Sequence, residues 1–245
     1  MRAAAASTLT LALLLTACAA DDPAQPQSAV TTASPTPSAS VPGTPPPAPS
    51  PTEESQPAEP TPPAEPAVLT STSGRPREAR MSIPALGVSG LRVVPYAGTP
   101  DDGPGTVIQD RGFAASPHGS GGLVGPGGIG NYLITGHRTS STAPFRYLPS
   151  VRVGARVVVA TGSHRLVYEI VGTRQTSFRS ERSLREQSAA VPGHPGQEPT
   201  RAMITLSTCA TPEDHAAGNF WSDEFHNPEH RIDKIGVLVR TTRSG

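Results

Sequence analysis

The pattern of apolar and polar positions changes near residue 80. Upstream, after one apolar run at residues 3–17, the chain alternates small, polar and proline residues, and no aromatic residue occurs before Tyr96. Downstream, short apolar runs are separated by Gly and Pro, a pattern typical of an all-β domain with many turns. These runs predict eight strands, at residues 80–83, 91–95, 105–109, 132–136, 156–161, 165–174, 202–208 and 233–241.

Eight strands fit a closed barrel, and few helical signals interrupt them. Gly162, Ser163 and His164 separate two of the predicted strands, which indicates a hairpin. The helical signals are the capping-box spacing of Ser183 and Glu186 and one or two turns at residues 142–148. We therefore expect an all-β fold, a closed eight-stranded barrel with one or two short helices.

Composition separates this folded domain from a segment that cannot build a core. The chain has 245 residues and 29 Pro, of which 16 lie between Pro23 and Pro76. A segment so poor in large apolar side chains buries too little surface to offset the entropy of ordering. Residues 19–78 are therefore expected to form a disordered stalk rich in Pro, Ser, Thr and Ala, which can extend at roughly 3.1 Å per residue. The folded domain is expected at residues 79–245.

Residues 1–18 have the layout of an export signal peptide. Arg2 precedes an apolar run that is too short to span a bilayer, because a transmembrane helix needs about 20 apolar residues. The ending Leu15-Thr16-Ala17-Cys18 resembles the lipobox of bacterial lipoproteins, in which the cysteine receives lipid and becomes the mature N-terminus. We expect lipid attachment at Cys18 and a membrane-anchored domain on the extracellular face, reaching into the cell wall. An ordinary secretory signal and an uncleaved anchor are the alternatives.

Charge argues against nucleic acid as the main partner. The whole chain carries 20 basic and 20 acidic side chains, and residues 79–245 carry 17 basic side chains, 16 of them Arg, against 13 acidic ones. Nucleic-acid-binding domains concentrate basic residues in a stripe. Here the arginines are scattered singly along the sequence.

Three polar side chains stand at the ends of predicted strands. Cys209 follows the apolar run 202–208, His137 follows the run 132–136, and Arg231 begins the last strand. Exported proteins usually pair their cysteines in disulfides, but lipidation of Cys18 would leave Cys209 alone. A lone cysteine is often a small buried apolar group, whereas a strand end on a rigid scaffold is where catalytic groups are displayed. If the three strands are neighbours, the three side chains can converge.

The strings that carry these residues resemble the signature elements of sortases, the cysteine transpeptidases of Gram-positive surfaces. They are Thr-Gly-His-Arg at 135–138, Thr-Leu-Ser-Thr-Cys at 205–209 and the arginine that heads the last strand, with Ile-Pro-Ala-Leu-Gly-Val at 83–88 near the domain start. The resemblance covers most of residues 79–241, and the pattern most resembles the class E or F sortases of high-GC Gram-positive bacteria. It implies a sortase-type barrel.

The resemblance also implies a mechanism that uses Cys, His and Arg and needs no metal or cofactor. Cys209 would attack the carbonyl between Thr and Gly of a Leu-Pro-x-Thr-Gly or Leu-Ala-x-Thr-Gly sorting signal and form an acyl-thioester. His137 would act as general acid and base, Arg231 would stabilise the oxyanion or hold the substrate backbone, and Thr208 could help to orient the pocket. The expected partners of this monomer are surface proteins that bear a sorting signal and an amine acceptor, such as a peptidoglycan precursor or a pilin.

The third catalytic role has alternatives within the sequence. Between Cys209 and Arg231 lie 21 residues, a longer excursion than in compact members of the family. Arg201 and Arg240 therefore remain alternatives to Arg231.

Other classes of function remain open for the same residues. Cys209 with the histidines at 215, 226 and 230 could bind zinc, although Pro228 disfavours the helix that the last two histidines would need. An exported cysteine protease, a thiol hydrolase, would differ only in resolving the thioester with water. A non-catalytic wall-binding lipoprotein would have no reason to display a reactive thiol.

Overall fold

The computed structural model of the chain describes residues 71–119 and 121–243. The predicted signal peptide, Cys18 and the predicted stalk up to residue 70 lie outside the described residues. Residues 71–78 form no helix or strand and run against a glycine-rich loop. There the Thr72 N–H donates to Gly127 O at 2.9 Å, and the Gly125 N–H donates to Gly74 O at 2.7 Å.

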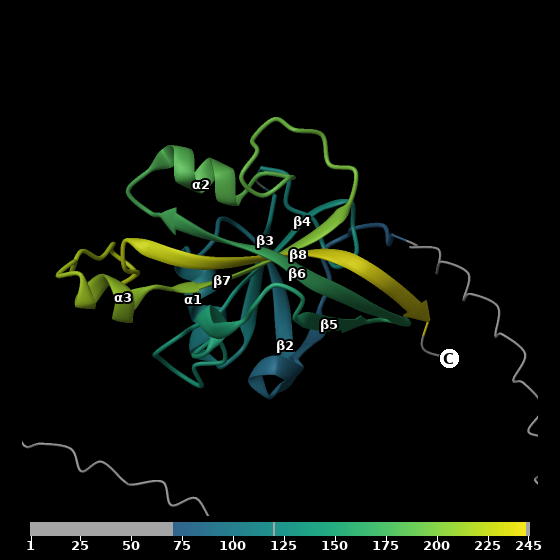
Figure 1. Cartoon of the computed structure of the whole chain (residues 1–245), viewed down its shortest axis with the longest axis horizontal. Coiled ribbons are helices and arrows are strands. Elements are labelled where there is room, and N and C mark those ends of the chain that lie inside the picture. Colours follow the sequence, from purple (N-terminus) through teal and green to yellow (C-terminus); the bar gives the residue numbers. More distant parts are fainter. Residues whose placement is uncertain (1–70, 120, 244–245) are drawn as a thin grey trace, which may run out of the picture. The chain divides into compact units, whose positions relative to one another are not determined.

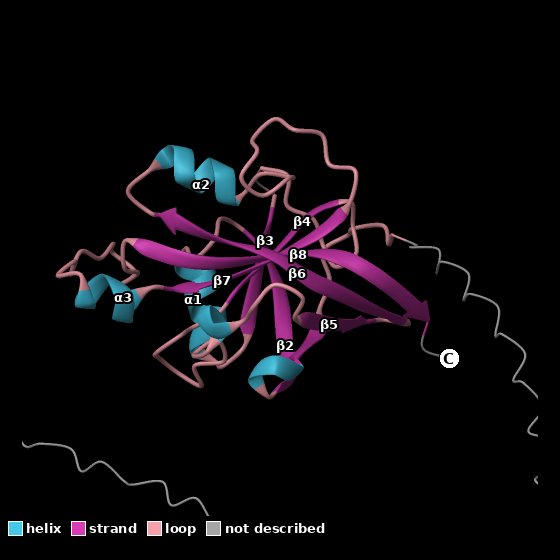
Figure 2. Cartoon of the chain, viewed as in Figure 1, coloured by secondary structure: helices cyan, strands magenta, loops and turns pink. Residues whose placement is uncertain are grey.

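Eight strands close into a barrel, as the sequence predicted (Figures 1 and 2). The order around the barrel is β1-β2-β3-β4-β7-β8-β6-β5, and β5 pairs back onto β1. The strands are β1 (Ala79–Ile83), β2 (Val88–Ala97), β3 (Ala114–His118), β4 (Gly130–Thr135), β5 (Arg156–Thr161), β6 (His164–Ser177), β7 (Ala202–Cys209) and β8 (His230–Arg243). The helices are α1 (Gly103–Asp110), α2 (Glu181–Gln187) and α3 (Thr211–Ala216), with 3-10 turns η1 (Pro84–Leu86) and η2 (Leu148–Ser150). None of the helices in the described ranges has both the length and the apolar character needed to cross a membrane.

Side-chain alternation along the strands fills the barrel interior. In β1, for example, Ala79, Met81 and Ile83 are buried while Arg80 between them is exposed. The large side chains inside form a single buried cluster, which includes Tyr132, Ile134, Phe145, Leu166, Tyr168, Ile204 and Leu206. A strand's polar face therefore lies outside the barrel, and functional groups collect at the strand ends or beneath the loops.

The two longest strands connect the ends of the barrel. β6 and β8 have 14 residues each and pair antiparallel from His164↔Arg243 to Ser177↔His230. β8 also pairs with β7 on its other side. Arg231 thus lies at one end of the barrel and Arg243 at the opposite end.

The prediction of a strand at residues 105–109 was wrong, because this segment is the helix α1. Thr106, Val107 and Ile108 are β-branched and favour a strand locally. The helix begins instead because the carboxylate of Asp102 accepts a hydrogen bond from the Gly105 N–H at 2.9 Å, and Pro104 is suited to a first helical turn.

The strand of the barrel that the hydrophobic pattern did not reveal is β3. Its sequence, Ala-Ala-Ser-Pro-His, has no large apolar side chain, yet it lies parallel to β2 with Val93↔Ala114 in register. The hairpin between β5 and β6 is confirmed, with Thr161↔His164 closing the turn. The helix near Ser183 is also confirmed, although its N-cap is Ser180, whose Oγ accepts from the Ser183 N–H at 3.2 Å.

Candidate active site

The strands that precede His137 and Cys209 are parallel neighbours. β4 and β7 pair in register from Gly130↔Ala202 to Thr135↔Ser207. Beyond that last pair, the Gly136 N–H donates to Ser207 O at 3.2 Å, and the Thr208 hydroxyl donates to Gly136 O at 2.7 Å. Since both strands run in the same direction, both sequence strings end at the same edge of the barrel.

Thr208 links the two strings rather than facing a ligand. Its side chain is 2% exposed, and its hydroxyl donates its hydrogen bond to the carbonyl of Gly136. Gly136 itself is closely packed, because a Cβ at this position would stand 2.8 Å from the ring of Phe145. The Phe145 N–H in turn donates to His137 O at 3.1 Å. The turn that carries His137 is therefore fixed by packing as well as by hydrogen bonds.

Arg231 is the arginine that the structure places beside Cys209. The two residues are register partners on β8 and β7, and Nη1 of Arg231 donates to Sγ of Cys209 at 2.8 Å. Arg240 pairs with Val167 far along β8, and Arg201 precedes the opposite end of β7. Of the three arginines considered, only Arg231 stands at the thiol.

Two further contacts fix the guanidinium of Arg231, which is fully buried. Its Nε donates to Oδ2 of Asp101 at 3.0 Å. The ring of Phe178 covers it, with 4.3 Å between the ring centroid and Cζ, a distance suited to a cation–π interaction. Its Nη2 is buried and has no hydrogen-bond partner among the described residues. A buried donor without a partner is costly, so this nitrogen is suited to a substrate oxygen.

Asp101 is the residue of this site that the sequence did not reveal. It is buried, adopts a left-handed backbone with φ 60°, and accepts from Nε2 of Gln109 at 2.7 Å through the oxygen that does not bind Arg231. Its backbone carbonyl accepts from Nδ2 of Asn227 at 3.0 Å. Asn227 lies in the long connection between β7 and β8, so that connection helps to position Asp101. Two consecutive aspartates before a short helix usually indicate a helix N-cap, so they are a weak signal for a buried site residue.

The charges around the thiol oppose one another. Burial raises the pKa of Cys209 above its ordinary value, Arg231 acts to lower it, and the carboxylate of Asp101 acts to raise it again. Burial is the largest of these effects, so the net pKa is raised. The side chain is nevertheless not sealed, since Cys209 is only partly buried.

His137 has a different partner from the one its predicted role requires. Its Nε2 lies 2.8 Å from Oδ1 of Asp110 at the end of α1. Within the described part of the chain no hydrogen bond joins His137 to Cys209. The His137 side chain is 14% exposed and that of Asp110 is 61% exposed, so solvent weakens the pair. The structure thus brings the imidazole to the barrel edge that carries Cys209, with Asp110 and not the thiol as its partner.

Arg138, the residue after the histidine, connects the two strand ends. Its Nη1 donates to the backbone carbonyl of Cys209 at 3.2 Å, and its guanidinium forms an ion pair with Glu213 of α3, in which Nη2 lies 2.8 Å from Oε1. The arginine of the Thr-Gly-His-Arg string therefore holds the segment that carries Cys209.

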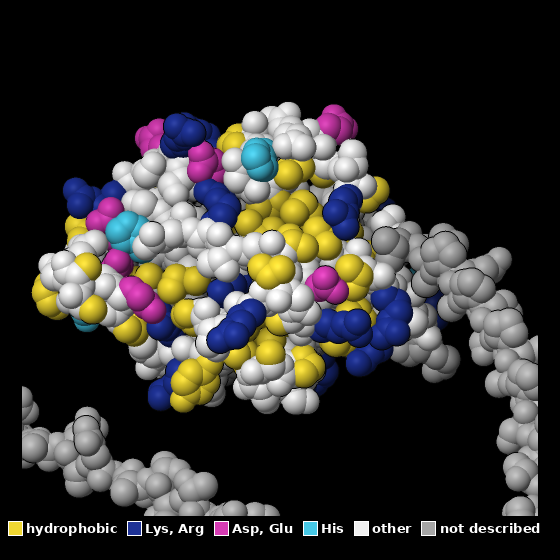
Figure 3. Space-filling model, viewed as in Figure 1, with side chains coloured by type: hydrophobic (Ala, Val, Ile, Leu, Met, Phe, Trp, Pro, Cys, Tyr) yellow, Lys and Arg dark blue, Asp and Glu magenta, His cyan; other side chains and the backbone are white. Residues whose placement is uncertain are grey.

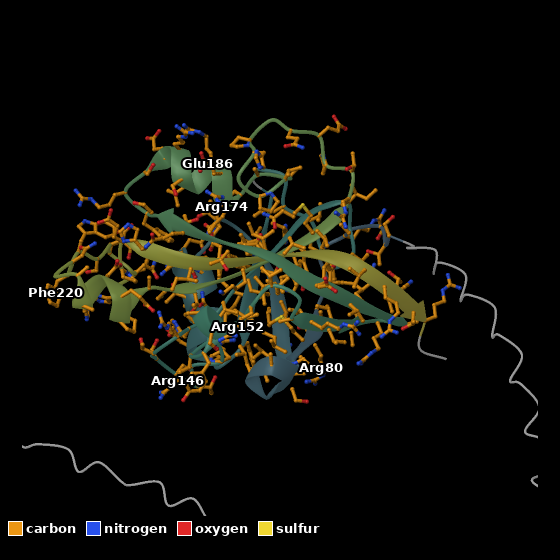
Figure 4. The ribbon with its side chains drawn as sticks, viewed as in Figure 1. Arg80, Arg146, Arg152, Arg174, Glu186 and Phe220 are labelled. Atoms are coloured by element: carbon orange, nitrogen blue, oxygen red, sulfur yellow. The ribbon has the colours of Figure 1, made fainter. Side chains whose placement is uncertain are left out.

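A second buried carboxylate attaches α2 to the barrel. Asp233, on the same face of β8 as Arg231, accepts from the hydroxyl of Thr176 at 2.6 Å and from Nε2 of Gln187 at 3.0 Å. Burial raises the pKa of Asp233 above its ordinary value. At the surface of the same segment, Arg174 and Glu186 form an ion pair at 2.8 Å (Figure 4).

A hollow of about 400 Å³ lies beside α2. Its lining comes from three connections that surround the strand ends: Thr99 before α1, Gly121 between β3 and β4, and the α2-to-β7 segment with Leu184, Ser188 and Pro195. Thr99 belongs to the same turn as Asp101, since its N–H donates to Oδ2 of Asp102 at 2.9 Å. The hollow therefore adjoins the residues that hold Arg231.

The alternative zinc site is not supported by the positions of the histidines. Nδ1 of His230 lies 2.7 Å from Oδ1 of Asp214, and the ring of His215 packs on Phe220, 4.8 Å between centroids. Within residues 71–119 and 121–243, no group of three or more His, Cys, Asp and Glu side chains is arranged to hold a metal ion.

Comparisons with known proteins agree with this geometry. The sequence matches the model of one protein family, described as the Sortase domain, over residues 81–221. No curated protein matches the chain.

The chain is similar to several solved structures of sortases. SrtA sortase from Actinomyces oris is 18% identical with a TM-score of 0.51, over 71% of this chain and 91% of that one. Sortase E1 from Streptomyces coelicolor is 22% identical with a TM-score of 0.51, over 71% and 94% of the two chains. SrtF sortase from Corynebacterium diphtheriae, at 18% identity and a TM-score of 0.49, covers 78% of this chain and 95% of its own. At these identities the first two likenesses show a shared fold.

Proposed function

The chain belongs to the sortase family, and from this we propose that it is a cysteine transpeptidase in which Cys209, His137 and Arg231 carry the reaction. The observation that supports this most directly is the contact of 2.8 Å between Nη1 of Arg231 and Sγ of Cys209. Parallel strands bring the histidine to the same barrel edge. The substrate is a sorting signal of the Leu-Pro-x-Thr-Gly or Leu-Ala-x-Thr-Gly type.

In the first half-reaction the Cys209 thiolate attacks the carbonyl carbon of the sorting-signal threonine. The carbonyl oxygen becomes an oxyanion, and the unpartnered Nη2 of Arg231 is the donor that can receive it. His137 gives its proton to the glycine nitrogen, the amide bond breaks, and the glycine segment leaves as an amine. The threonine is then joined to Sγ as a thioester.

In the second half-reaction an amine replaces the enzyme on the threonine carbonyl. The neutral His137 accepts a proton from the attacking amine, a new amide bond forms, and the bond from carbon to Sγ breaks. Cys209 leaves as a thiolate, and the imidazolium beside it is restored. A peptidoglycan precursor or a pilin lysine would supply the amine.

The hollow beside α2 is the proposed place for the sorting signal. It is about 400 Å³ in volume and is lined by Thr99, Leu184 and Pro195 among others, which suits an apolar residue upstream of the cleaved bond. Its position next to the turn of Asp101 would lead an extended peptide toward Arg231 and Cys209. The sequence pattern supports assignment to class E or F.

The location of the enzyme is proposed from its N-terminal sequence alone. Residues 1–18 resemble a lipoprotein signal ending at Cys18, and residues 19–78 resemble a proline-rich stalk. Export and lipidation would place the domain outside the membrane, within reach of wall precursors and surface proteins.

Incubation with a panel of sorting peptides and an added amine, read by mass spectrometry, tests the proposal. We expect a product that joins the threonine to the amine, and no product from Cys209→Ala. Release of the upstream peptide with a C-terminal threonine carboxylate, at the same rate with or without amine, would indicate a protease instead. Failure of Cys209 to react with a thiol-directed sorting-peptide analogue in the folded protein would favour a non-catalytic wall-binding domain.

A further inference from the structure

The charges of the domain are separated along β8. Arg231 and Arg243 are 12 residues apart on this strand, which corresponds to about 40 Å at a rise of roughly 3.3 Å per residue. Carboxylates gather near the Arg231 end, from Asp101, Asp110, Asp214 and Glu229. Figure 3 shows Lys and Arg side chains gathered instead at the far end of β5 and β8, near the point marked C in Figure 1.

Strand register builds this concentration of arginines from residues that are distant in the sequence. Arg80 on β1 lies beside Ala160 on β5, Ala160 lies beside Arg165 on β6, and Arg165 lies beside Thr242 on β8. All four are exposed. They form a continuous row across the outer wall of the barrel, with small residues between the arginines.

Three more arginines extend this row. Arg240 and Arg243 are exposed near the end of β8. Nη1 of Arg77 would stand 3.8 Å from a Cβ built at Gly162, in the turn that joins β5 to β6. We define the basic face as Arg77, Arg80, Arg165, Arg240 and Arg243. Figure 4 labels Arg80, the member of this face on β1.

Within the described ranges the basic face has no carboxylate partner. None of its five arginines forms an ion pair there, in contrast to Arg138, Arg174, Arg179, Arg182 and Arg185 near the other end. Glu78 lies at the edge of this face, where its carboxylate pairs with Arg92 at 2.5 Å and also feels the charge of Arg80. The face is also hollowed: one hollow of about 330 Å³ is lined by Arg80, Arg92 and Glu78, and a second of about 230 Å³ by Arg77 and Arg243.

We propose that the basic face docks on the anionic phospholipid surface of the cell's own membrane. Unpaired guanidinium groups bind phosphate through paired hydrogen bonds, and each basic residue near an anionic membrane adds to the attraction. Residues 71–78, which end at β1 beside this face, are the route by which the N-terminal segment enters the domain. That segment begins with the predicted export signal, so under the proposed location of the enzyme, on which this inference rests, its start would be held at the membrane.

Docking by this face would orient the enzyme. The carboxylate-rich end would be repelled by the anionic surface and turned outward, and β8 would hold Cys209 and Arg231 away from the lipid. The proposal does not depend on the transpeptidase reaction, because it concerns the far end of the barrel.

Vesicle sedimentation tests the proposal. The full chain with Cys18→Ser, which cannot be lipidated, is mixed with phosphatidylcholine vesicles with or without phosphatidylglycerol. We expect binding only to the anionic vesicles. Arg80→Glu/Arg165→Glu should reduce it by about tenfold or more, since two charges are reversed at the face. Arg146→Glu/Arg152→Glu makes the same change in net charge at exposed sites between β4 and β5 (Figure 4) and should change binding by less than about threefold.

Three outcomes would overturn the proposal. They are equal binding to neutral vesicles, equal loss of binding in the two double variants, and binding to soluble poly(glycerol phosphate) without binding to vesicles, which would indicate a wall polymer instead. Thermal unfolding shows that each variant is folded. Turnover of a soluble sorting peptide should be unchanged in Arg80→Glu/Arg165→Glu, so failure of the docking proposal and failure of the transpeptidase proposal give different results.

Discussion

Arg231 and Cys209 face each other across β8 and β7 as register partners, with Nη1 2.8 Å from Sγ. The pairing fixes the arginine beside the thiol through the backbone of two strands, not through a flexible loop. A second strand pair, β4 with β7, brings the histidine string to the same edge. The barrel's register therefore determines which polar groups can meet.

Replacement of Arg231 should reduce both rate and stability. We expect Arg231→Ala to lower kcat/KM by about a hundredfold or more, because an oxyanion donor is lost. It should also lower the free energy of unfolding by about 3–5 kcal/mol, because Asp101 is left as an unpaired buried charge. The double variant Arg231→Ala/Asp101→Ala should recover much of the stability and none of the rate. Peptide kinetics and urea unfolding measure the two effects, and Arg240→Ala is the matched control.

Asp101 should set the acidity of the thiol through Arg231. Its carboxylate acts to raise the pKa of Cys209, so Asp101→Asn should lower that pKa, while the amide oxygen can still accept from Arg231. The rate of alkylation of Cys209 by iodoacetamide, measured against pH, reports the thiolate directly and needs no turnover. Asp102→Asn removes the same charge one residue away and retains a good helix cap. An identical pH profile for the two variants would contradict the role of Asp101.

His137 and Asp110 should contribute very unequally. His137→Ala should reduce turnover by about 10²–10⁴-fold, the usual range for a lost general acid and base. Asp110→Asn should change turnover by less than about tenfold, because the carboxylate is 61% exposed and its pairing with the histidine is screened. If Asp110→Asn were as damaging as His137→Ala, Asp110 would have to act on the histidine during the reaction.

Asp233 should make the folded protein more stable in mild acid. Burial raises its pKa above the ordinary value of 3.8, so between that value and the raised one the folded protein holds a proton that the unfolded chain has released. The free energy of unfolding should therefore fall as pH rises across this interval. Asp233→Asn should remove that slope. Urea unfolding at a series of pH values measures it, and an unchanged slope in the variant would place the titrating group elsewhere.

Strand ends were predicted from the sequence wherever large apolar residues mark them. The run 132–136 and the run 202–208 locate β4 and β7, so His137 and Cys209 could be placed at strand ends. β3 could not be found, because its small residues are selected by close packing between β2 and β4, not by hydrophobicity. The strand predicted at 105–109 failed because the cap formed by Asp102 outweighed the β preference of Thr106 and Val107.

Clusters of side chains that depend on strand register could not be predicted from the sequence. Asp101 is 130 residues from Arg231, and no spacing rule connects an aspartate in the turn before a helix to an arginine in the last strand. The basic face is similar, since Arg80, Arg165 and Arg243 are scattered singly along the chain and only the pairing of β1, β5, β6 and β8 brings them together. Along the linear sequence the same arginines form no basic stripe.

The parallel pairing of β4 with β7 has a consequence for folding kinetics. Its partners, such as Gly130 and Ala202, are separated by 72 residues, and contacts between distant segments form slowly because loop-closure entropy opposes them. The thiol and the imidazole can thus reach the same edge only once β4 and β7 have paired. A substitution that slows this pairing would reduce the number of competent molecules in a preparation while leaving the turnover of each one unchanged, and active-site titration would distinguish the two.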